Sequence, residues 1–142
     1  MDPNHGQPRD KVPYAENHQK LLQTIGFDIF DEIPDEHEAD SEFVQSRRMQ
    51  DARGSEGTYT GCMRGNKMHG KGTMLFDDGA RCDGLWNSGK LHGKGRNIWS
   101  SGASARQGIW DNDSTTEGMM SYFVNGRVEK YTNGRWVKVV QN

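Results

Sequence analysis

Residues 59–72 read YTGCMRGNKMHGKG, and residues 82–95 read CDGLWNSGKLHGKG. The second stretch repeats the glycine positions and the closing His-Gly-Lys-Gly of the first. Four glycines recur at a constant spacing of 23 residues: Gly61 and Gly84, Gly70 and Gly93, Gly72 and Gly95, and Gly79 and Gly102. A fixed period of this length is typical of a repeat architecture, so we expect a fold made of stacked copies of one unit.

A third copy follows with weaker similarity. Gly108 and Trp110 lie 24 residues beyond Gly84 and Trp86, and residues 116–119, TEGM, stand where the His-Gly-Lys-Gly element is expected. Terminal repeats often depart from the consensus, because one of their faces has no neighbouring repeat.

Each unit is predicted to be a β-hairpin. The units are too short for a helix pair, and their apolar residues alternate with other residues as in a strand. Asn66, Gly89 and Asp113 occupy one equivalent turn position, and these residue types tolerate positive φ better than most. The dipeptide Asn133-Gly134, a strong hairpin signal, predicts a closing β-hairpin within residues 127–142.

The composition also favours a thin fold. The chain has 18 glycines, 4 prolines and a hydrophobic content of only 32 %. We therefore predict an all-β protein, an elongated single-layer antiparallel sheet of consecutive hairpins. Residues 57–126 are expected to hold three repeats and about six strands, and residues 1–56 an acidic, mostly disordered segment with a helix over residues 14–25.

The order Tyr-x-Gly, turn, His-Gly-x-Gly, aromatic strand and closing glycine resembles the MORN repeat. The resemblance covers roughly residues 57–126, with two good copies and one degraded copy. It implies a twisted ribbon of hairpins with a groove lined by aromatic side chains. The leading tyrosine and the tryptophan of the family are not kept in every copy: Tyr59 becomes Cys82 and then Arg106, and Met63 becomes Trp86 and then Trp110.

The resemblance also implies a function. MORN arrays act as non-enzymatic adaptors or scaffolds, so we expect an aromatic groove that binds a partner segment, a helix or a peptide, within a cytoskeletal or multi-subunit assembly. MORN-like arrays also accompany lipid kinases and lysine methyltransferases, but the remaining residues are too few for a catalytic domain. The expected partner-binding residues are Tyr59, Met63, Phe76, Trp86, Trp99, Trp110 and Phe123.

Other chemistry is less favoured. His69 and His92 are equivalent, but no third metal ligand repeats beside them, so packing or turn hydrogen bonds are expected and neither a metal nor a cofactor is predicted. The Gly-Lys-Gly elements lack the following helix that a phosphate loop needs. Cys62 and Cys82 are expected on opposite faces of the sheet, unable to form a disulfide.

Charge divides the chain in two. Residues 1–56 carry 6 basic and 13 acidic residues, a net charge of −7, whereas residues 57–142 carry 12 and 7, a net charge of +5. The alternative function is therefore a peripheral tether that binds anionic phospholipid through basic repeat turns. The basic residues considered for it are Lys67, Lys71, Lys90, Lys94 and Arg96. This charge is too small to predict nucleic-acid binding.

The N-terminal segment leaves two hypotheses open. Eight carboxylates and no lysine or arginine lie between Asp28 and Glu42, while Leu21, Leu22 and Ile25 form an apolar face before them. The segment is either an internal lid over the aromatic, basic sheet or a separate motif for a second partner. No signal peptide or membrane span is predicted, so a cytoplasmic location is expected, in association with the cytoskeleton or a cilium.

Overall fold

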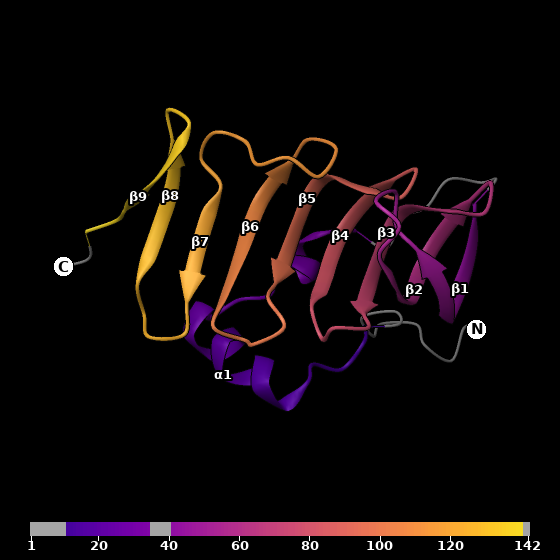
Figure 1. The fold of residues 1–142 in the computed structure, drawn as a ribbon, viewed down its shortest axis with the longest axis horizontal. Coiled ribbons are helices and arrows are strands. Elements are labelled where there is room, and N and C mark those ends of the chain that lie inside the picture. Colours follow the sequence, from indigo (N-terminus) through magenta and orange to yellow (C-terminus); the bar gives the residue numbers. More distant parts are fainter. Residues whose placement is uncertain (1–10, 35–40, 141–142) are drawn as a thin grey trace.

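The computed structural model describes residues 11–34 and 41–140, and in this part of the chain nine strands form one antiparallel sheet. The strands lie side by side in chain order, so every neighbouring pair is a hairpin (Figure 1). Their bounds are β1 (Glu42–Gln50), β2 (Glu56–Arg64), β3 (Lys67–Phe76), β4 (Arg81–Asn87), β5 (Lys90–Ile98), β6 (Ser104–Trp110), β7 (Met120–Phe123), β8 (Val128–Thr132) and β9 (Arg135–Lys138). The predicted all-β, single-sheet fold is confirmed.

The repeated glycines face one another across the strands. Gly61 of β2 is opposite Gly72 of β3, and Gly84 of β4 is opposite Gly95 of β5. A Cβ atom at Gly84 would lie 2.5 Å from the Cα of Gly95, and one at Gly61 would lie 2.4 Å from the Cα of Gly72. Adjacent strands therefore approach each other more closely here than any side chain permits.

The turns have the backbone conformation that the sequence indicates. Asn66, Gly89 and Asp113 have φ angles of +62°, +87° and +71°. Asn133 and Gly134, with φ angles of +52° and +81°, connect β8 to β9. Positive φ at two successive positions matches the twist of the flanking strands in a tight hairpin, so these residues hold β9 in register.

Strand β1 was not predicted. Strands β2 to β7 and the β8–β9 hairpin correspond to the six repeat strands and the closing hairpin, and β1 adds a ninth strand before them. It pairs with β2, with an irregularity between Val44 and Arg47 and a φ of +52° at Ser46. This bulge interrupts the alternation of side chains, which removes the usual sequence signal of a strand.

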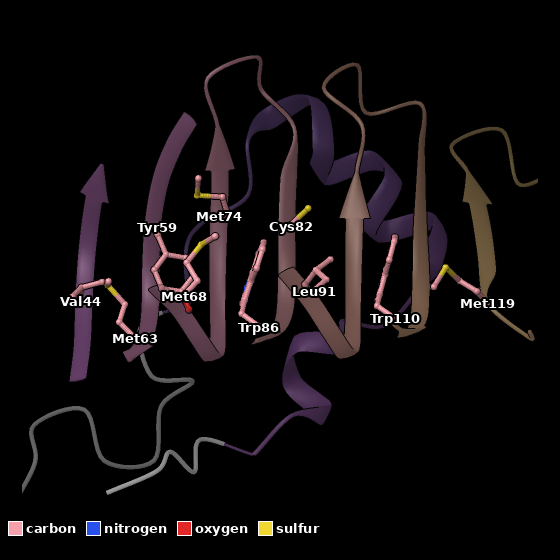
Figure 2. Close-up of a cluster of buried hydrophobic side chains, with 10 residues drawn as sticks. All are labelled: Val44, Tyr59, Met63, Met68, Met74, Cys82, Trp86, Leu91, Trp110 and Met119. Carbon is pink, nitrogen blue, oxygen red and sulfur yellow. The ribbon is translucent and has the colours of Figure 1, made fainter. Parts of the chain in front are cut away.

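The sheet has apolar residues on both faces. One face, which we name the tryptophan face, carries an apolar cluster that runs from β1 to the segment before β7 (Figure 2). Its buried members are Val44, Tyr59, Met63, Met68, Met74, Cys82, Trp86, Leu91, Trp110 and Met119. The other face, the covered face, carries a smaller cluster of Ile98 and Ala105 with residues of the N-terminal helix.

The N-terminal segment lies on the covered face. Helix α1 (Glu16–Ile25) packs Leu21 and Ile25 against Ile98 and Ala105, and a short 3-10 helix, η1 (Ile29–Glu32), follows it. Figure 2 shows this helical segment behind the sheet, with the tryptophan-face side chains in front.

Part of the acidic run is therefore ordered, contrary to the expectation of disorder. Ile29, Phe30 and Ile33 are buried, and the Asp28 side chain accepts a hydrogen bond from the backbone N–H of Phe30. Apolar side chains interspersed among the acids stabilise this segment against the sheet. The rest of the predicted disorder falls on residues 1–10 and 35–40, outside the described residues.

Replacing Gly84 by alanine tests the close strand contact. The added Cβ would overlap the backbone of β5, so we expect the free energy of unfolding in urea to fall by about 2 kcal/mol or more. Gly65→Ala is the matched control, because Gly65 also has positive φ but no atom within 4 Å of an added Cβ. Its cost is expected to be about 1 kcal/mol. Equal losses of unfolding free energy in the two variants would show that the close approach of β4 and β5 does not require glycine at position 84.

Candidate functional site

The covered face contains a buried network of charges. Arg81 and Asp83 of β4 and Arg96 of β5 are at most 1 % exposed. The Arg81 Nε donates to both carboxylate oxygens of Asp83, at 3.1 and 2.9 Å, and Arg96 approaches Asp83 at 3.5 Å. Two guanidinium groups thus share one carboxylate within the sheet, which leaves one positive charge unbalanced. A second carboxylate, from another part of the chain, balances it.

That second charge is Asp28 of the N-terminal segment. Its carboxylate accepts hydrogen bonds from Arg96, at 2.9 Å, and from the Tyr14 hydroxyl, at 2.5 Å. Burial by itself raises the pKa of Asp28, but Arg96, Tyr14 and Lys11 together lower it to about 2. The Arg81 guanidinium lies 3.7 Å from the centre of the Tyr14 ring. The N-terminal segment is therefore held by charge as well as by apolar packing.

The segment acts as an internal cover, but on the face opposite the tryptophans. The Lys71 ammonium donates to the carbonyl of Ile33 at 2.6 Å and lies over the Phe30 ring. Arg96 is fully buried beneath the segment. Residues 11–33 lie on the sheet as the lid hypothesis expected, but they cover the face opposite the tryptophans. The tryptophan face is not covered by this segment.

Two tryptophans are built into the sheet itself. The Trp86 Nε1 donates to the carbonyl of Gly72 at 3.1 Å, and the Trp110 Nε1 donates to the carbonyl of Gly95 at 2.8 Å. Each indole thus lies across the preceding strand, above a glycine. Trp86 is 3 % exposed and Trp110 is 7 % exposed. Because their polar group is satisfied and their rings are buried, both side chains contribute mainly to stability.

The β1–β2 turn closes part of the tryptophan face. Its Ala52 N–H donates to the carbonyl of Gly89, in the β4–β5 turn, at 3.1 Å. Asp51 is buried and accepts hydrogen bonds from the backbone N–H groups of Arg53 and Ser55, each at 2.9 Å. The β1–β2 turn is thereby fixed against the β4–β5 turn.

The seven expected partner-binding residues lie on this one face, but they differ in exposure. Tyr59 and Met63 are buried like Trp86 and Trp110, and Phe76 and Phe123 are partly buried. Trp99, with 41 % of its surface exposed, is the most accessible of the seven. Four of the seven residues are thus buried in the apolar cluster of the tryptophan face, and the other three reach the surface.

An open cavity of about 830 Å³ lies beside Trp99. Phe76 and Trp110 contribute to its lining together with Asn97 and Arg106. The Arg106 guanidinium carbon lies 5.5 Å from the centre of the Trp99 ring and 4.8 Å from that of Trp136. This cation is therefore placed between two indoles, which fixes Trp99 at the edge of the cavity.

Arg106 and Trp136 were not among the expected site residues. Arg106 holds the position of Tyr59 in the third copy, and that substitution was visible in the sequence. Trp136 comes from β9, where it packs on Tyr131 with ring centres 5.2 Å apart. The spacing of residues in the sequence does not indicate that an indole of β9 contacts a side chain of β6, three strands away in the sheet.

The comparison with protein families bears directly on the hairpins that build this face. The MORN repeat model matches residues 59–81 and 82–104. Residues 59–104 are two MORN repeats. A comparison with curated proteins finds no significant match. MORN repeats are in general non-catalytic modules that bind proteins or membranes.

The histidines of the two MORN repeats have separate local partners. His69 lies 3.4 Å from Arg64, and the Nδ1 of His92 accepts a hydrogen bond from the backbone N–H of Asn112 at 3.2 Å. Within residues 11–34 and 41–140, no group of three or more His, Cys, Asp or Glu residues could hold a metal ion. No helix in the same ranges is both long and apolar enough to cross a bilayer.

The cysteines of the MORN repeats are free and buried. Cys82 belongs to the apolar cluster of the tryptophan face, and Cys62 lies outside that cluster. Burial raises the pKa of the Cys82 thiol, so the thiol stays protonated at neutral pH. The protonated Cys82 thiol donates to the Asn97 Oδ1 at 3.1 Å.

The pKa of Asp28 predicts how stability depends on pH. A carboxylate with a lowered folded-state pKa stabilises the fold above its ordinary pKa, 3.8, and loses this contribution as the pH falls towards about 2. We expect Asp28→Asn to lose roughly 2 kcal/mol of unfolding free energy at pH 7. Urea unfolding at a series of pH values measures this loss.

The difference between wild type and Asp28→Asn should shrink between pH 4 and pH 2, because the wild-type carboxylate becomes protonated there. Glu16→Gln, an exposed substitution in α1, serves as the control. A difference that stays constant over this pH range would contradict the proposed role of Asp28.

Proposed function

We propose that this MORN-repeat chain is a protein-binding adaptor or scaffold that uses the open end of its tryptophan face. The observation that carries the proposal is the contrast along this face. Trp86 and Trp110 are only 3 % and 7 % exposed, whereas Trp99 is 41 % exposed beside a cavity of about 830 Å³. An exposed indole held rigidly beside a cavity is the kind of residue that contributes most to protein interfaces.

The proposed contact residues follow from exposure. Phe76, Trp99 and Phe123 would touch the partner, with Arg106 and Trp136 holding Trp99 in place. Tyr59, Met63, Trp86 and Trp110, also expected from the sequence to bind, would act beneath the surface by forming its floor. A short peptide segment fits this cavity better than an amphipathic helix, because the buried indoles leave no continuous apolar groove.

A lipid tether is the less favoured alternative. Its basic stripe was expected to include Lys71 and Arg96, and both are engaged with the N-terminal segment. Lys67, Lys90 and Lys94 remain exposed. Lys67 and Lys90 begin β3 and β5, and Lys94 lies within β5. Three lysines are a weak attraction for an anionic bilayer, worth about 1 kcal/mol each at most. Protein binding is therefore favoured over membrane binding.

The wider setting of the chain stays a proposal. A binding role without catalysis agrees with the non-catalytic character of MORN repeats. Membership of a cytoskeletal or multi-subunit assembly, in the cytoplasm or at a cilium, is the setting that the resemblance implies. The partner must supply a segment that can reach a cavity at the end of a hairpin sheet.

Trp99→Ala tests the proposed surface. The full chain, its Trp99→Ala variant and an Ile109→Ala control are immobilised and exposed to lysate of the source cells, and captured proteins are quantified by mass spectrometry. Ile109 is a suitable control because it is also exposed, at 53 %, but on the covered face. It lies two residues from Gln107 in β6, and Gln107 is opposite the buried Arg96 of the covered face. We expect a protein that is captured at least tenfold less by Trp99→Ala and equally by Ile109→Ala.

Two results would contradict the proposal. Capture that is unchanged by Trp99→Ala would exclude this end of the tryptophan face. Binding to vesicles with anionic lipid that is lost in high salt, without any Trp99-dependent protein, would favour the lipid tether instead.

A further inference from the structure

The cavity beside Trp99 is acidic, although the part of the chain that surrounds it is basic. Its charged lining comprises four carboxylates and two guanidinium groups, a formal charge of −2: Glu56, Asp77, Asp78, Asp113, Arg53 and Arg106. Residues 57–142 as a whole carry a net charge of +5. Negative charge is thus concentrated at this cavity of the tryptophan face.

Pairing within the chain does not remove this excess. Asp77 is neutralised by a two-pronged contact with Arg48, at 2.6 and 2.8 Å, and Arg53 is neutralised by Asp51 at 3.1 Å. These two pairs take one negative and one positive charge out of the lining. Three carboxylates then face a single cation, Arg106, so the net charge stays at −2.

The remaining carboxylates have little cationic contact of their own. Asp78 accepts a hydrogen bond from the backbone N–H of Ala80, and Glu56 comes no closer than 4.0 Å to Arg48. One oxygen of Asp113 accepts from the Leu91 N–H and the other is buried, so Asp113 adds negative charge to the lining without offering an accessible acceptor. Asp78 and Glu56 are exposed and have acceptor capacity left for a donor from outside the chain.

The aromatic lining favours the same kind of ligand. One side of Trp99 is taken by Arg106, and 41 % of the Trp99 surface remains exposed. Indole faces attract ammonium and guanidinium groups, and the methylene stems of lysine and arginine pack well on aromatic rings. Phe76 offers a second ring at the cavity. A cationic side chain can therefore use the carboxylates and the rings together.

We infer that the cavity binds a basic segment of the partner protein, with a lysine or arginine side chain seated on Trp99 and its charge directed to Asp78 and Glu56. The inference rests on the proposed protein-binding function and specifies the chemistry of the partner. It also separates this site from lipid binding, because an acidic cavity repels an anionic bilayer. Arg106 positions Trp99 and does not itself contact the basic segment.

A peptide titration with the full chain tests the inference. The probes are a fluorescein-labelled peptide of alternating lysine and serine residues and its glutamate and glutamine counterparts, followed by fluorescence anisotropy. We expect the lysine peptide to bind best and its affinity to fall with added salt. Trp99→Ala should weaken it about tenfold, and the double variant Glu56→Gln/Asp78→Asn about fivefold. Glu16→Gln, on the covered face, should leave it unchanged.

The Arg106→Gln variant tests the sign of the ligand's charge. Loss of this cation removes one repulsive charge and also one packing partner of Trp99, so the ratio of lysine-peptide affinity to glutamate-peptide affinity should rise. Preferential binding of the glutamate peptide that is abolished by Arg106→Gln would overturn the inference and leave protein binding intact. Lysine-peptide binding that is unaffected by Trp99→Ala and by the double variant would also overturn it, while the lysate capture decides separately whether the face binds a protein.

Discussion

The contact between facing glycines on adjacent strands is the constraint on which the rest of this structure depends. Where Gly61 meets Gly72, and Gly84 meets Gly95, neither strand carries a side chain on that spot. The ring of Tyr59 occupies the space above Gly72, and the indole of Trp110 lies beside Gly95. The Trp86 and Trp110 indoles each donate to a glycine carbonyl of the strand before them. A sheet one layer thick thus builds an apolar core out of the side chains of its own face.

This arrangement determines what the two faces can do. Buried arginines on the covered face need carboxylates, and the N-terminal segment supplies Asp28 with a phenol hydroxyl from Tyr14. On the tryptophan face, the β1–β2 turn is held against the β4–β5 turn by the hydrogen bond from Ala52 to Gly89. The only part of this face, within the described residues, that combines a large exposed ring with a cavity is the end around Trp99. The proposed binding function is therefore assigned to the exposed surface around Trp99.

The sequence was informative wherever a local rule determines the structure. The glycine period predicted the hairpins, and Asn133-Gly134 predicted the closing turn, because positive φ and close strand approach restrict the residue type at single positions. Strand β1 was not predicted, since a bulge at Ser46 breaks its alternation. The acidic run concealed Asp28 as a buried partner of Arg96. Burial of Trp86 and exposure of Trp99 depend on sheet curvature, which no spacing of residues reports.

The tryptophans of one face differ in solvent accessibility, and the assigned binding surface depends on this difference. Hydroxyl-radical footprinting of the full chain measures it most directly. Oxidation of each tryptophan is read by mass spectrometry and normalised to the rate in the unfolded chain. Trp99 should be oxidised several times faster than Trp86 and Trp110, whose rings are 3 % and 7 % exposed. Similar rates for Trp99 and Trp86 would mean that the chain does not bury Trp86, and the assignment of the binding surface to the region around Trp99 would be wrong.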